Sequence, residues 1–284
     1  MKDKFLASLF YILPHHAISG LMFACARIKW KPLKNLIIRI YTSLNHVQMH
    51  EAVEQDMYSY ESLNAFFTRA WKAECRPFEK DERNWLCPVD GSVSQAQAIE
   101  QGRIFQAKGH EYSLLELVGG DHELEKLFRN GQFATLYLSP RDYHRIHMPT
   151  TGKLKHMQYI PGRLFSVAGY TVEHIPRLFA RNERCVCHFE TEQGPMAMVL
   201  VGAINVSATE TVWHGLVSSE DRKMKRFEYK DGDIELQRGD EMGRFNLGST
   251  VIILATDEMI IDESITAGAE IRLGQCLARP ASDR

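Results

Sequence analysis

The sequence predicts an α+β protein, with helices first and a mainly antiparallel β core after them. Up to about residue 75, apolar residues recur at helical spacing or in helix-length runs. From about residue 85, short β-rich runs alternate with turn residues. Regular alternation of strands and helices is missing, which argues against a doubly wound parallel sheet. We therefore expect a helical appendage at 1–75 and a β-rich domain at 76–284.

Composition excludes several classes of protein and separates the amino-terminal segment from the remainder. With 44% hydrophobic and 25% charged residues among 284, the chain is typical of globular proteins and unlike collagen or disordered chains. A net charge of −2 argues against a dedicated nucleic-acid binder. The first 40 residues hold seven Lys or Arg and one acid, a charge of +6, so the remaining residues carry −8. A basic head on an acidic body indicates contact with an anionic membrane surface.

Two apolar runs make up most of this head, Phe5–Leu13 and Ala17–Ala26, and a Pro-His-His sequence separates them. Neither run reaches the roughly 20 residues that a membrane-spanning helix needs. We expect helices that lie in the membrane interface, with Trp30 and the basic side chains at the level of the headgroups. Two alternatives stay open. One is a pair of core helices that never contacts lipid, and the other is a signal peptide, whose cleavage site Ala24–Ala26 resembles.

The remaining elements follow from local patterns. Residues 44–75 are predicted to be helical, with Ser62 as a cap and Pro77 as the stop. A further helix is expected at Glu123–Arg129, ended by Gly131. Five runs have the character of strands, namely Val89–Ile99, Phe133–Leu138, Met196–Val206, Ile234–Gln237 and Ser249–Ala255.

The six cysteines form no Cys-x-x-Cys pair, and their scatter is typical of free thiols in a reducing compartment. Cys185 and Cys187 stand beside His188, but no second pair matches them, so we interpret them as ordinary strand residues and expect no metal. The chain also lacks the sequence motifs of α/β-hydrolases, P-loop proteins, dinucleotide-binding folds and zinc proteases.

Three segments combine residue types that carry chemistry, Pro88–Gly91 (PVDG), Asp142–Pro149 (DYHRIHMP) and Phe245–Thr250 (FNLGST). Taken singly, each has an ordinary structural interpretation as a turn, a polar loop or the entry to a strand. Together they supply an acid, an imidazole and a hydroxyl, the groups of a serine activated by an oriented histidine.

This combination resembles the phosphatidylserine decarboxylases of the membrane-associated bacterial and mitochondrial type, which are pyruvoyl enzymes. The likeness extends over most of the chain, from the basic apolar head through Arg76-Pro77 and the run 201–206 (VGAINV) to LGST. It implies self-cleavage between Gly248 and Ser249 into a β chain, 1–248, and an α chain, 249–284. It also implies that Ser249 becomes the covalent pyruvoyl cofactor. A homodimer of the αβ unit is a further hypothesis, which the sequence does not decide.

The resemblance assigns roles to individual residues. His147, oriented by Asp90, is the base for the Ser249 hydroxyl, which attacks the carbonyl of Gly248. His144 is assigned to decarboxylation, either as the acid that protonates the carbanion or as a contact to the substrate. The implied reaction converts phosphatidylserine to phosphatidylethanolamine through a Schiff base with the pyruvoyl group, which accepts the electrons left by carbon dioxide. The enzyme would be peripheral, at the cytoplasmic face of a bacterial cell membrane.

One substrate contact and two rival functions complete the expectations. The segment 161–166 (PGRLFS) either holds the lipid phosphate, with Ser166 as a ligand, or is a structural turn. The first rival is a membrane-bound serine hydrolase that uses Asp90, His147 and Ser249 and keeps its serine. The second is a non-enzymatic membrane-binding β module in which these polar residues are structural.

Overall fold

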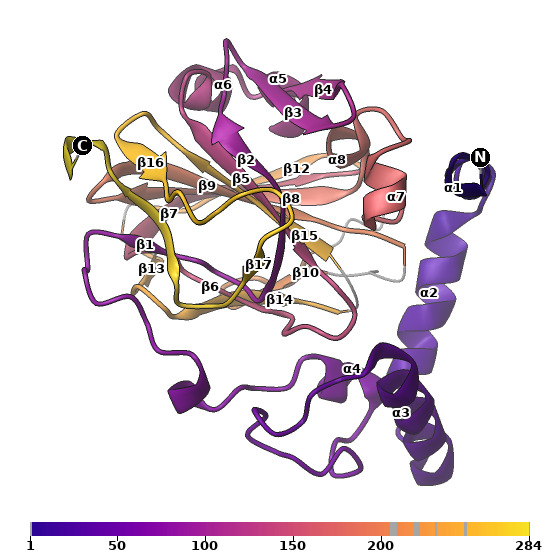
Figure 1. Cartoon of the computed structure of the whole chain (residues 1–284). Coiled ribbons are helices and arrows are strands. Elements are labelled where there is room, and N and C mark those ends of the chain that lie inside the picture. The colour runs from indigo at the N-terminus through magenta and orange to yellow at the C-terminus, as the bar shows by residue number, and fades with distance from the viewer. Residues whose placement is uncertain (1, 205–208, 218–221, 231, 247–248, 284) are drawn as a thin grey trace.

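The computed structural model describes residues 2–204, 209–217, 222–230, 232–246 and 249–283. Helices precede a core made of antiparallel strands, so the predicted α+β class is confirmed. Figure 1 shows the amino-terminal helices on one side of the sheets, with the carboxyl-terminal strands on the side opposite to them.

Three helices form the amino-terminal region, α1 (Lys2–Leu9), α2 (His15–Ala26) and α3 (Lys31–Asn45). Pro14 stands immediately before α2, and a second proline lies in the first turn of α3, where a missing N–H leaves no hydrogen bond unmade. In the part of the chain that the structure describes, no helix is long and apolar enough to cross a membrane.

The helix predicted over 44–75 is wrong for most of its length. The helix α3 ends at Asn45, and the next residue, His46, has a left-handed φ of 52°. The rest of the segment contains two short helical turns, α4 (Leu63–Phe67) and η1 (Ala73–Cys75). Between α3 and α4 the Asp56 side chain accepts a hydrogen bond from a backbone amide two residues later, a local bond that competes with helix formation. Ser62 does cap α4, because its hydroxyl accepts from the amide of Ala65 at 3.2 Å.

The core is built on a nine-stranded antiparallel sheet in the order β12-β7-β8-β9-β15-β5-β2-β17, with β13 also paired to β7. Its strands are β2 (Gly91–Ala98), β5 (Gln132–Leu138), β7 (Gly152–Ile160), β8 (Arg184–Thr191), β9 (Gly194–Val201), β12 (Lys225–Glu228), β13 (Glu235–Leu236), β15 (Ser249–Ala255) and β17 (Glu270–Ile271). Four of the predicted strands thus correspond to β2, β5, β13 and β15. The fifth, 196–206, is too long, since β9 leaves the sheet at Gly202 and residues 205 and 206 lie outside the described part.

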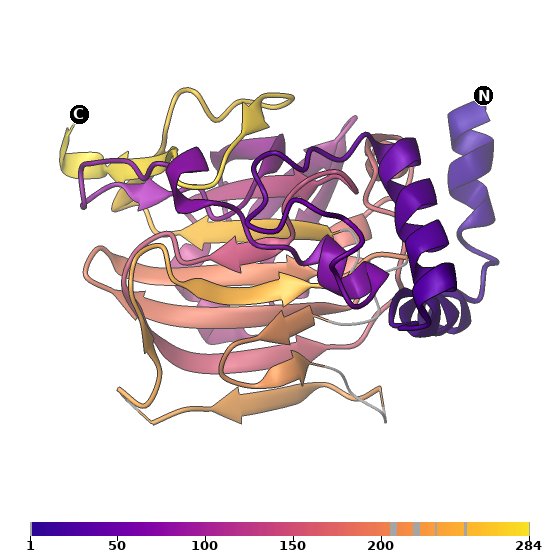
Figure 2. The same cartoon turned by 90° about the horizontal axis from the view of Figure 1, so that it is seen from below.

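A second, four-stranded sheet packs beside the first, and the main hydrophobic core includes residues of both (Figure 2). Its order is β11 (Gly215–Val217), β10 (Thr209–Thr211), β14 (Glu241–Phe245) and β6 (Arg145–His147). The remaining elements are β1 (Trp85–Leu86), β3 (Arg103–Ala107), β4 (His110–Ser113), α5 (Leu114–Leu117), α6 (His122–Phe128), α7 (Gly169–Val172), α8 (Leu178–Arg181), β16 (Met259–Ile261), β18 (Cys276–Pro280) and η2 (Ala281–Asp283). The helix expected at Glu123–Arg129 is α6, shifted by one residue because Asp121 caps it.

One end of the large sheet collects the segments singled out in the sequence. Because neighbouring antiparallel strands run in opposite directions, the first residue of one strand lies beside the last residue of the next. At this end β2 begins at Gly91, β5 ends at Leu138, β15 begins at Ser249 and β9 ends at Val201. We call it the Ser249 end. The opposite end, where the turn between β8 and β9 lies, is called the Gln193 end.

Candidate active site

Ser249 is the first residue of β15, in the interior of the protein. It pairs with Leu138 of β5, its side chain is fully buried, and its hydroxyl has no hydrogen-bond partner among the described residues. A buried hydroxyl without a partner costs free energy, which makes Ser249 a candidate for a chemical role; the neighbouring Thr250 hydroxyl has the same property. Gly248, on the other side of the expected cleavage site, lies outside the described residues.

His144 is also fully buried. Its Nδ1 lies 2.9 Å from the carbonyl oxygen of Asp142. A carbonyl only accepts, so Nδ1 carries the hydrogen and Nε2 carries the lone pair. Within the described chain Nε2 has no hydrogen-bond partner, and the ring packs on Phe67 with centroids 3.9 Å apart. Burial lowers the pKa of His144 to about 3, so the imidazole is neutral at physiological pH.

His147 has different surroundings. Its Nδ1 donates to the carbonyl oxygen of Gly239 at 2.7 Å, and its Nε2 is 2.9 Å from the Tyr143 hydroxyl. Since Nδ1 carries the hydrogen of the neutral ring, Nε2 accepts from Tyr143. Burial lowers the pKa of His147 as well, which favours this neutral form.

The two histidines lie on opposite faces of one short strand, because side chains alternate along β6 and its flanks. His144 shares its face with Ile146 and Met148, which are fully buried in the main core. His147 shares the other face with Tyr143 and Arg145. Along β14 the register places His147 opposite Glu241, whereas the His144 carbonyl accepts from the Phe245 amide, close in sequence to Ser249. The structure therefore places His144, rather than His147, nearer to the start of β15.

Asp90 sits just before β2, and both of its carboxylate oxygens are engaged. Arg76 donates from Nη2 to Oδ2 at 2.6 Å and from Nε to Oδ1 at 2.9 Å. The Trp71 indole donates to Oδ2 at 2.9 Å, and the Leu273 amide donates to Oδ1 at 2.8 Å. The bond to Leu273 reaches into the segment 249–284, so Asp90 joins the two expected pieces of the chain.

Two aromatic side chains link Asp90 to His147, the residue that the resemblance expects it to orient. Trp71, which donates to Asp90, stacks on the ring of Tyr143 at a centroid distance of 5.6 Å. Tyr143 in turn stacks on His147 at 5.7 Å and donates to its Nε2. The order of contacts is Asp90, Trp71, Tyr143 and His147.

A largely apolar cavity of about 180 Å³ connects the Ser249 end with the amino-terminal helices. Leu138, the strand partner of Ser249, lines it, as does Phe67, which packs on His144. The other lining residues come from α2, α3, α4 and the loops after β5, β7 and β9, namely Met22, Tyr41, Leu63, Tyr137, Pro140, Ser166, Val167, Ala168, Ala203 and Ile204. The cavity thus lies between the predicted lipid-binding helices and the residues that contact Ser249 and His144.

Of the segment proposed to hold a phosphate, only Ser166 lines this cavity, and its hydroxyl accepts from the Ala168 amide at 3.3 Å. The preceding residues contact the turn between α1 and α2 instead. Arg163 donates to the carbonyl oxygen of Tyr11 at 2.8 Å, and the His16 ring is 3.1 Å from the carbonyl oxygen of Gly162. Most of the segment therefore attaches the helices to the β core.

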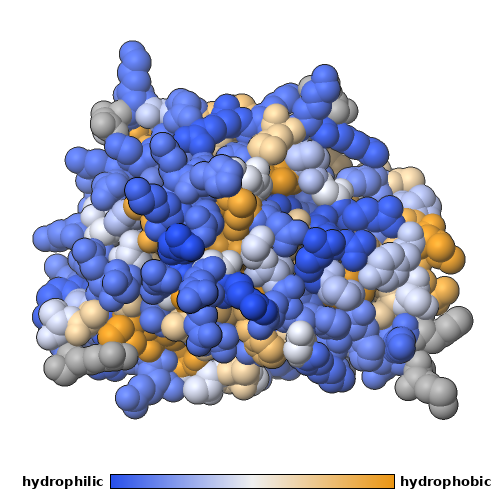
Figure 3. Space-filling model, turned by 90° about the horizontal axis from the view of Figure 1, so that it is seen from above, coloured by the Kyte–Doolittle hydropathy of each residue, from blue (hydrophilic) through white to orange (hydrophobic). Residues whose placement is uncertain are grey.

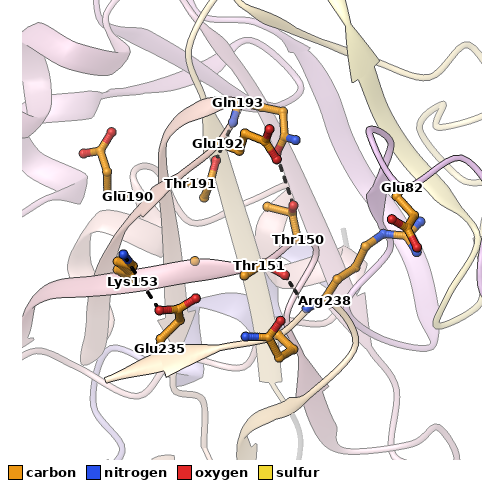
Figure 4. Close-up of a pocket in the computed structure, with 12 residues that line it drawn as sticks. Glu82, Thr150, Thr151, Lys153, Glu190, Thr191, Glu192, Gln193, Glu235 and Arg238 are labelled. Atoms are coloured by element: carbon orange, nitrogen blue, oxygen red, sulfur yellow. Dashed lines mark hydrogen bonds and ion pairs between the residues drawn. The ribbon is translucent and has the colours of Figure 1, made fainter. Parts of the chain in front are cut away.

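A larger cavity, of about 630 Å³, lies at the Gln193 end and has a polar lining (Figure 4). Its side chains bond one another, as in Thr150 to Gln193 at 3.1 Å and the Lys153–Glu235 ion pair at 3.9 Å. Full-length strands separate it from Ser249, so size alone does not identify the active site.

Sequence reasoning missed several residues of the site. Phe67 and Trp71 lie in the segment 44–75, which was predicted only to be helical, and Met22 and Tyr41 had no expected role beyond the amino-terminal segment. No sequence pattern ties these side chains to Asp90 or Ser249, because the contacts depend on the tertiary fold. Tyr143 is different, since it stands inside DYHRIHMP, and its spacing of four residues from His147 was an available signal.

Comparison with known proteins gives the family. A family profile described as phosphatidylserine decarboxylase matches residues 63–279, and a second, described as PSD, matches residues 6–42. The chain belongs to the phosphatidylserine decarboxylase family. Three similar curated relatives are named phosphatidylserine decarboxylase proenzyme. They come from Pseudomonas entomophila (50% identity, 99% of both chains), Pseudomonas aeruginosa strain LESB58 (50%, 98% of both) and Ectopseudomonas mendocina (52%, 98% of both). Likeness to this decarboxylase family thus extends over both the helices and the β core.

Proposed function

We propose that this chain decarboxylates phosphatidylserine to phosphatidylethanolamine after cutting itself between Gly248 and Ser249. The observation that carries the proposal is Ser249 itself, a buried hydroxyl without a partner in the described chain, at the start of a central strand. Relatives named proenzymes support a processed enzyme.

In the cleavage step, the Ser249 oxygen bonds to the carbonyl carbon of Gly248, and the amide C–N bond breaks to leave an ester. β-Elimination breaks the bond between Cβ and Oγ of residue 249, releases the carboxylate of Gly248 and leaves dehydroalanine at position 249. Its imine tautomer then takes up water and loses ammonia, which gives the pyruvoyl group. Glycine before the serine favours attack because it has no Cβ to shield the carbonyl. We keep His147 as the base for the Ser249 proton, with Asp90 supporting it through Trp71 and Tyr143.

We expect the new α chain, 249–284, to stay in the sheet after cleavage, because its strands remain paired. β15 pairs along its whole length with β5 and over six residues with β9. Its interior residues are buried, and β17 and β18 add pairings to β2 and β1. The fragment is therefore held by the sheet itself.

For decarboxylation, the pyruvoyl group at position 249 supplies a carbonyl that binds the substrate amine and withdraws the electron pair left by carbon dioxide. His144 is the residue of this chain best suited to move a proton there, because its neutral Nε2 is unpartnered in the described structure. The apolar lining from Phe67 and Leu138 excludes water from that space. Ser166 is the proposed contact for the lipid phosphate.

The amino-terminal helices are proposed to lie on an anionic membrane surface. Figure 3 shows apolar side chains gathered at the margin of the molecule where these helices lie. The exposed apolar residues of this region are Leu6, Tyr11, Ile12, Leu21, Met22, Trp30, Leu36, Ile40 and Leu44. Lys29, Lys31 and Arg39 add positive charge beside them. Met22 belongs both to this surface and to the cavity lining, which gives the substrate a short route inward.

Two finer assignments belong to the same proposal. The enzyme is peripheral, at the cytoplasmic face of a bacterial membrane, and its αβ units form a homodimer. The division into a membrane-associating region, 1–75, and a catalytic domain, 76–284, is likewise proposed.

The test is the mass of the purified protein. We expect two fragments that correspond to 1–248 and 249–284, with a carbonyl group at the amino terminus of the shorter one, and turnover of phosphatidylserine in vesicles. An uncleaved, active chain that reacts with a fluorophosphonate contradicts this mechanism and favours the serine hydrolase. Absence of both cleavage and turnover favours the non-enzymatic membrane module.

A further inference from the structure

Tyr143 contacts both His147 and Trp71, the indole that donates to Asp90. The proposal above includes it only as a link between Asp90 and His147 and gives its hydroxyl no role of its own. Tyr143 is 4% exposed, and burial raises its pKa, so the hydroxyl keeps its proton at physiological pH. The hydroxyl is 2.9 Å from Nε2 of His147.

The contact between the Tyr143 hydroxyl and Nε2 determines how the lone pair of His147 is used. A neutral ring has one nitrogen with a hydrogen and one with a single in-plane lone pair. In His147 the hydrogen is on Nδ1, which donates to the Gly239 carbonyl, and the lone pair on Nε2 is filled by the Tyr143 hydroxyl. A proton from any other group therefore reaches Nε2 either through the Tyr143 oxygen or after this hydrogen bond has broken.

The ring of Tyr143 is itself fixed in place, because it stacks between Trp71 and His147. Trp71 donates to Asp90, so the position of Tyr143 is tied to the Asp90 carboxylate as well.

We propose that Tyr143 is a positioning residue for self-cleavage, which holds the His147 ring in the neutral tautomer with its lone pair on Nε2. This inference rests on the cleavage proposed above and names a residue that makes His147 competent for it.

The test compares Tyr143→Phe with the unmodified chain by following the appearance of the two fragments after synthesis, over a range of pH. Phenylalanine keeps the stacked ring and removes only the hydroxyl. We expect cleavage to slow at least tenfold, to a rate similar to that of His147→Ala. Tyr112→Phe, which removes a buried hydroxyl between β4 and Phe179, is the matched control and should cleave normally.

The pH profile separates positioning from simple packing. The Tyr143 hydroxyl donates to the neutral ring, so its removal raises the pKa of His147 and moves the acid limb of the cleavage rate to higher pH. The other charged groups around His147 are Glu241, Arg145 and Asp90, and all of them remain in the variant. Cleavage of Tyr143→Phe at the normal rate or faster, with an unchanged profile, overturns the inference.

Two further results keep the inference distinct from the proposed function. If the unmodified chain itself never cleaves, the proposed function fails, whatever Tyr143 does. If Tyr143→Phe does not fold, imidazole ¹⁵N spectra of the uncleaved Ser249→Ala chain decide the matter. The inference requires a neutral His147 ring at pH 7 with its proton on Nδ1, and a proton on Nε2 contradicts it.

Discussion

The two ends of the large sheet differ in the way their polar groups are satisfied. At the Gln193 end, the polar side chains around the larger cavity bond one another or face solvent, as Thr150 and Gln193 do. At the Ser249 end, the cavity is smaller and mainly apolar, and both Ser249 Oγ and His144 Nε2 are buried without a partner among the described residues. We therefore expect the chemistry at the smaller cavity, because unsatisfied buried groups are retained only at a cost. Thr256 Oγ1, beyond the other end of β15, is also buried without a partner in the described chain, but no imidazole accompanies it among the residues of the larger cavity.

The amino-terminal helices contact the Ser249 end. α2 and α3 contribute Met22 and Tyr41 to the apolar cavity, and the turn between α1 and α2 bonds Arg163. Trp71 and Arg76, which bond Asp90, lie at the same end. The region proposed to bind the membrane and the proposed reacting groups thus share one cavity.

The largest effect should come from Ser249→Ala. Without the hydroxyl neither the ester nor the pyruvoyl group can form, so we expect a full-length chain with no measurable decarboxylation. Fragment masses and release of carbon dioxide from vesicles containing phosphatidylserine measure the two losses. Thr150→Ala removes a buried hydroxyl at the Gln193 end and should leave cleavage intact. A Ser249→Ala chain that still cleaves between 248 and 249 would refute the nucleophile assignment.

His144→Ala should separate the two reactions. We expect cleavage to proceed and decarboxylation to fall about 10²- to 10⁴-fold, the usual effect of removing a proton-transfer group. His188→Ala, which removes a buried histidine in the middle of β8, is the control for packing. If His144→Ala keeps its fold but no longer cleaves, the assignment of His144 to decarboxylation alone is contradicted. His144 would then be the base for Ser249.

The same residue predicts a feature of the pH profile. Burial lowers the pKa of His144 to about 3, so its neutral form is complete above that value and is lost only in strong acid. Decarboxylation by the processed enzyme should therefore show no loss attributable to His144 between pH 5 and pH 8. A fall in rate that disappears in the His144→Ala background would contradict the neutral, buried imidazole.

Sequence patterns were sufficient for the parts of the fold that obey local rules. The run 249–255 is apolar and β-branched, and it is the strand β15. The Ser62 cap and the break between the two apolar helices also follow from the residues themselves. The helix predicted over 44–75 failed because side-chain bonds such as that from Asp56 stabilise turns there, and apolar content alone does not reveal them.

The candidate residues of the site were predictable from the sequence, and their partners were not. Asp90, His144, His147 and Ser249 stand in motifs, and three strand termini bring these motifs to one end of the sheet. Their catalytic roles stay predictions. Arg76 and Trp71 bond Asp90 from either side of the short turn η1, where no periodicity of the sequence indicates the contact.

An intermediate effect is expected from the exposed helical surface. Ile12 is 79% exposed and Leu44 is 74% exposed, so replacing both by Glu should disturb the fold little. Two buried contacts with lipid are lost and two negative charges are added, and we expect binding to anionic vesicles to weaken at least tenfold. Leu127→Glu, on the exposed face of α6, is the control for charge. Sedimentation with vesicles at equal lipid concentration measures the difference. Equal binding of the unmodified chain, the double variant and Leu127→Glu would contradict the proposal that these helices bind the membrane.

The smallest effect should come from the larger cavity. Glu192 lies at the turn between β8 and β9 and lines that cavity (Figure 4). Glu192→Gln keeps the shape and removes one charge, and we expect cleavage and decarboxylation to change less than twofold, because no reacting group lies at this end. A tenfold loss of decarboxylation in a folded, fully cleaved Glu192→Gln enzyme would show that both ends of the sheet take part in turnover. The contrast between satisfied and unsatisfied polar groups would then no longer locate the active site.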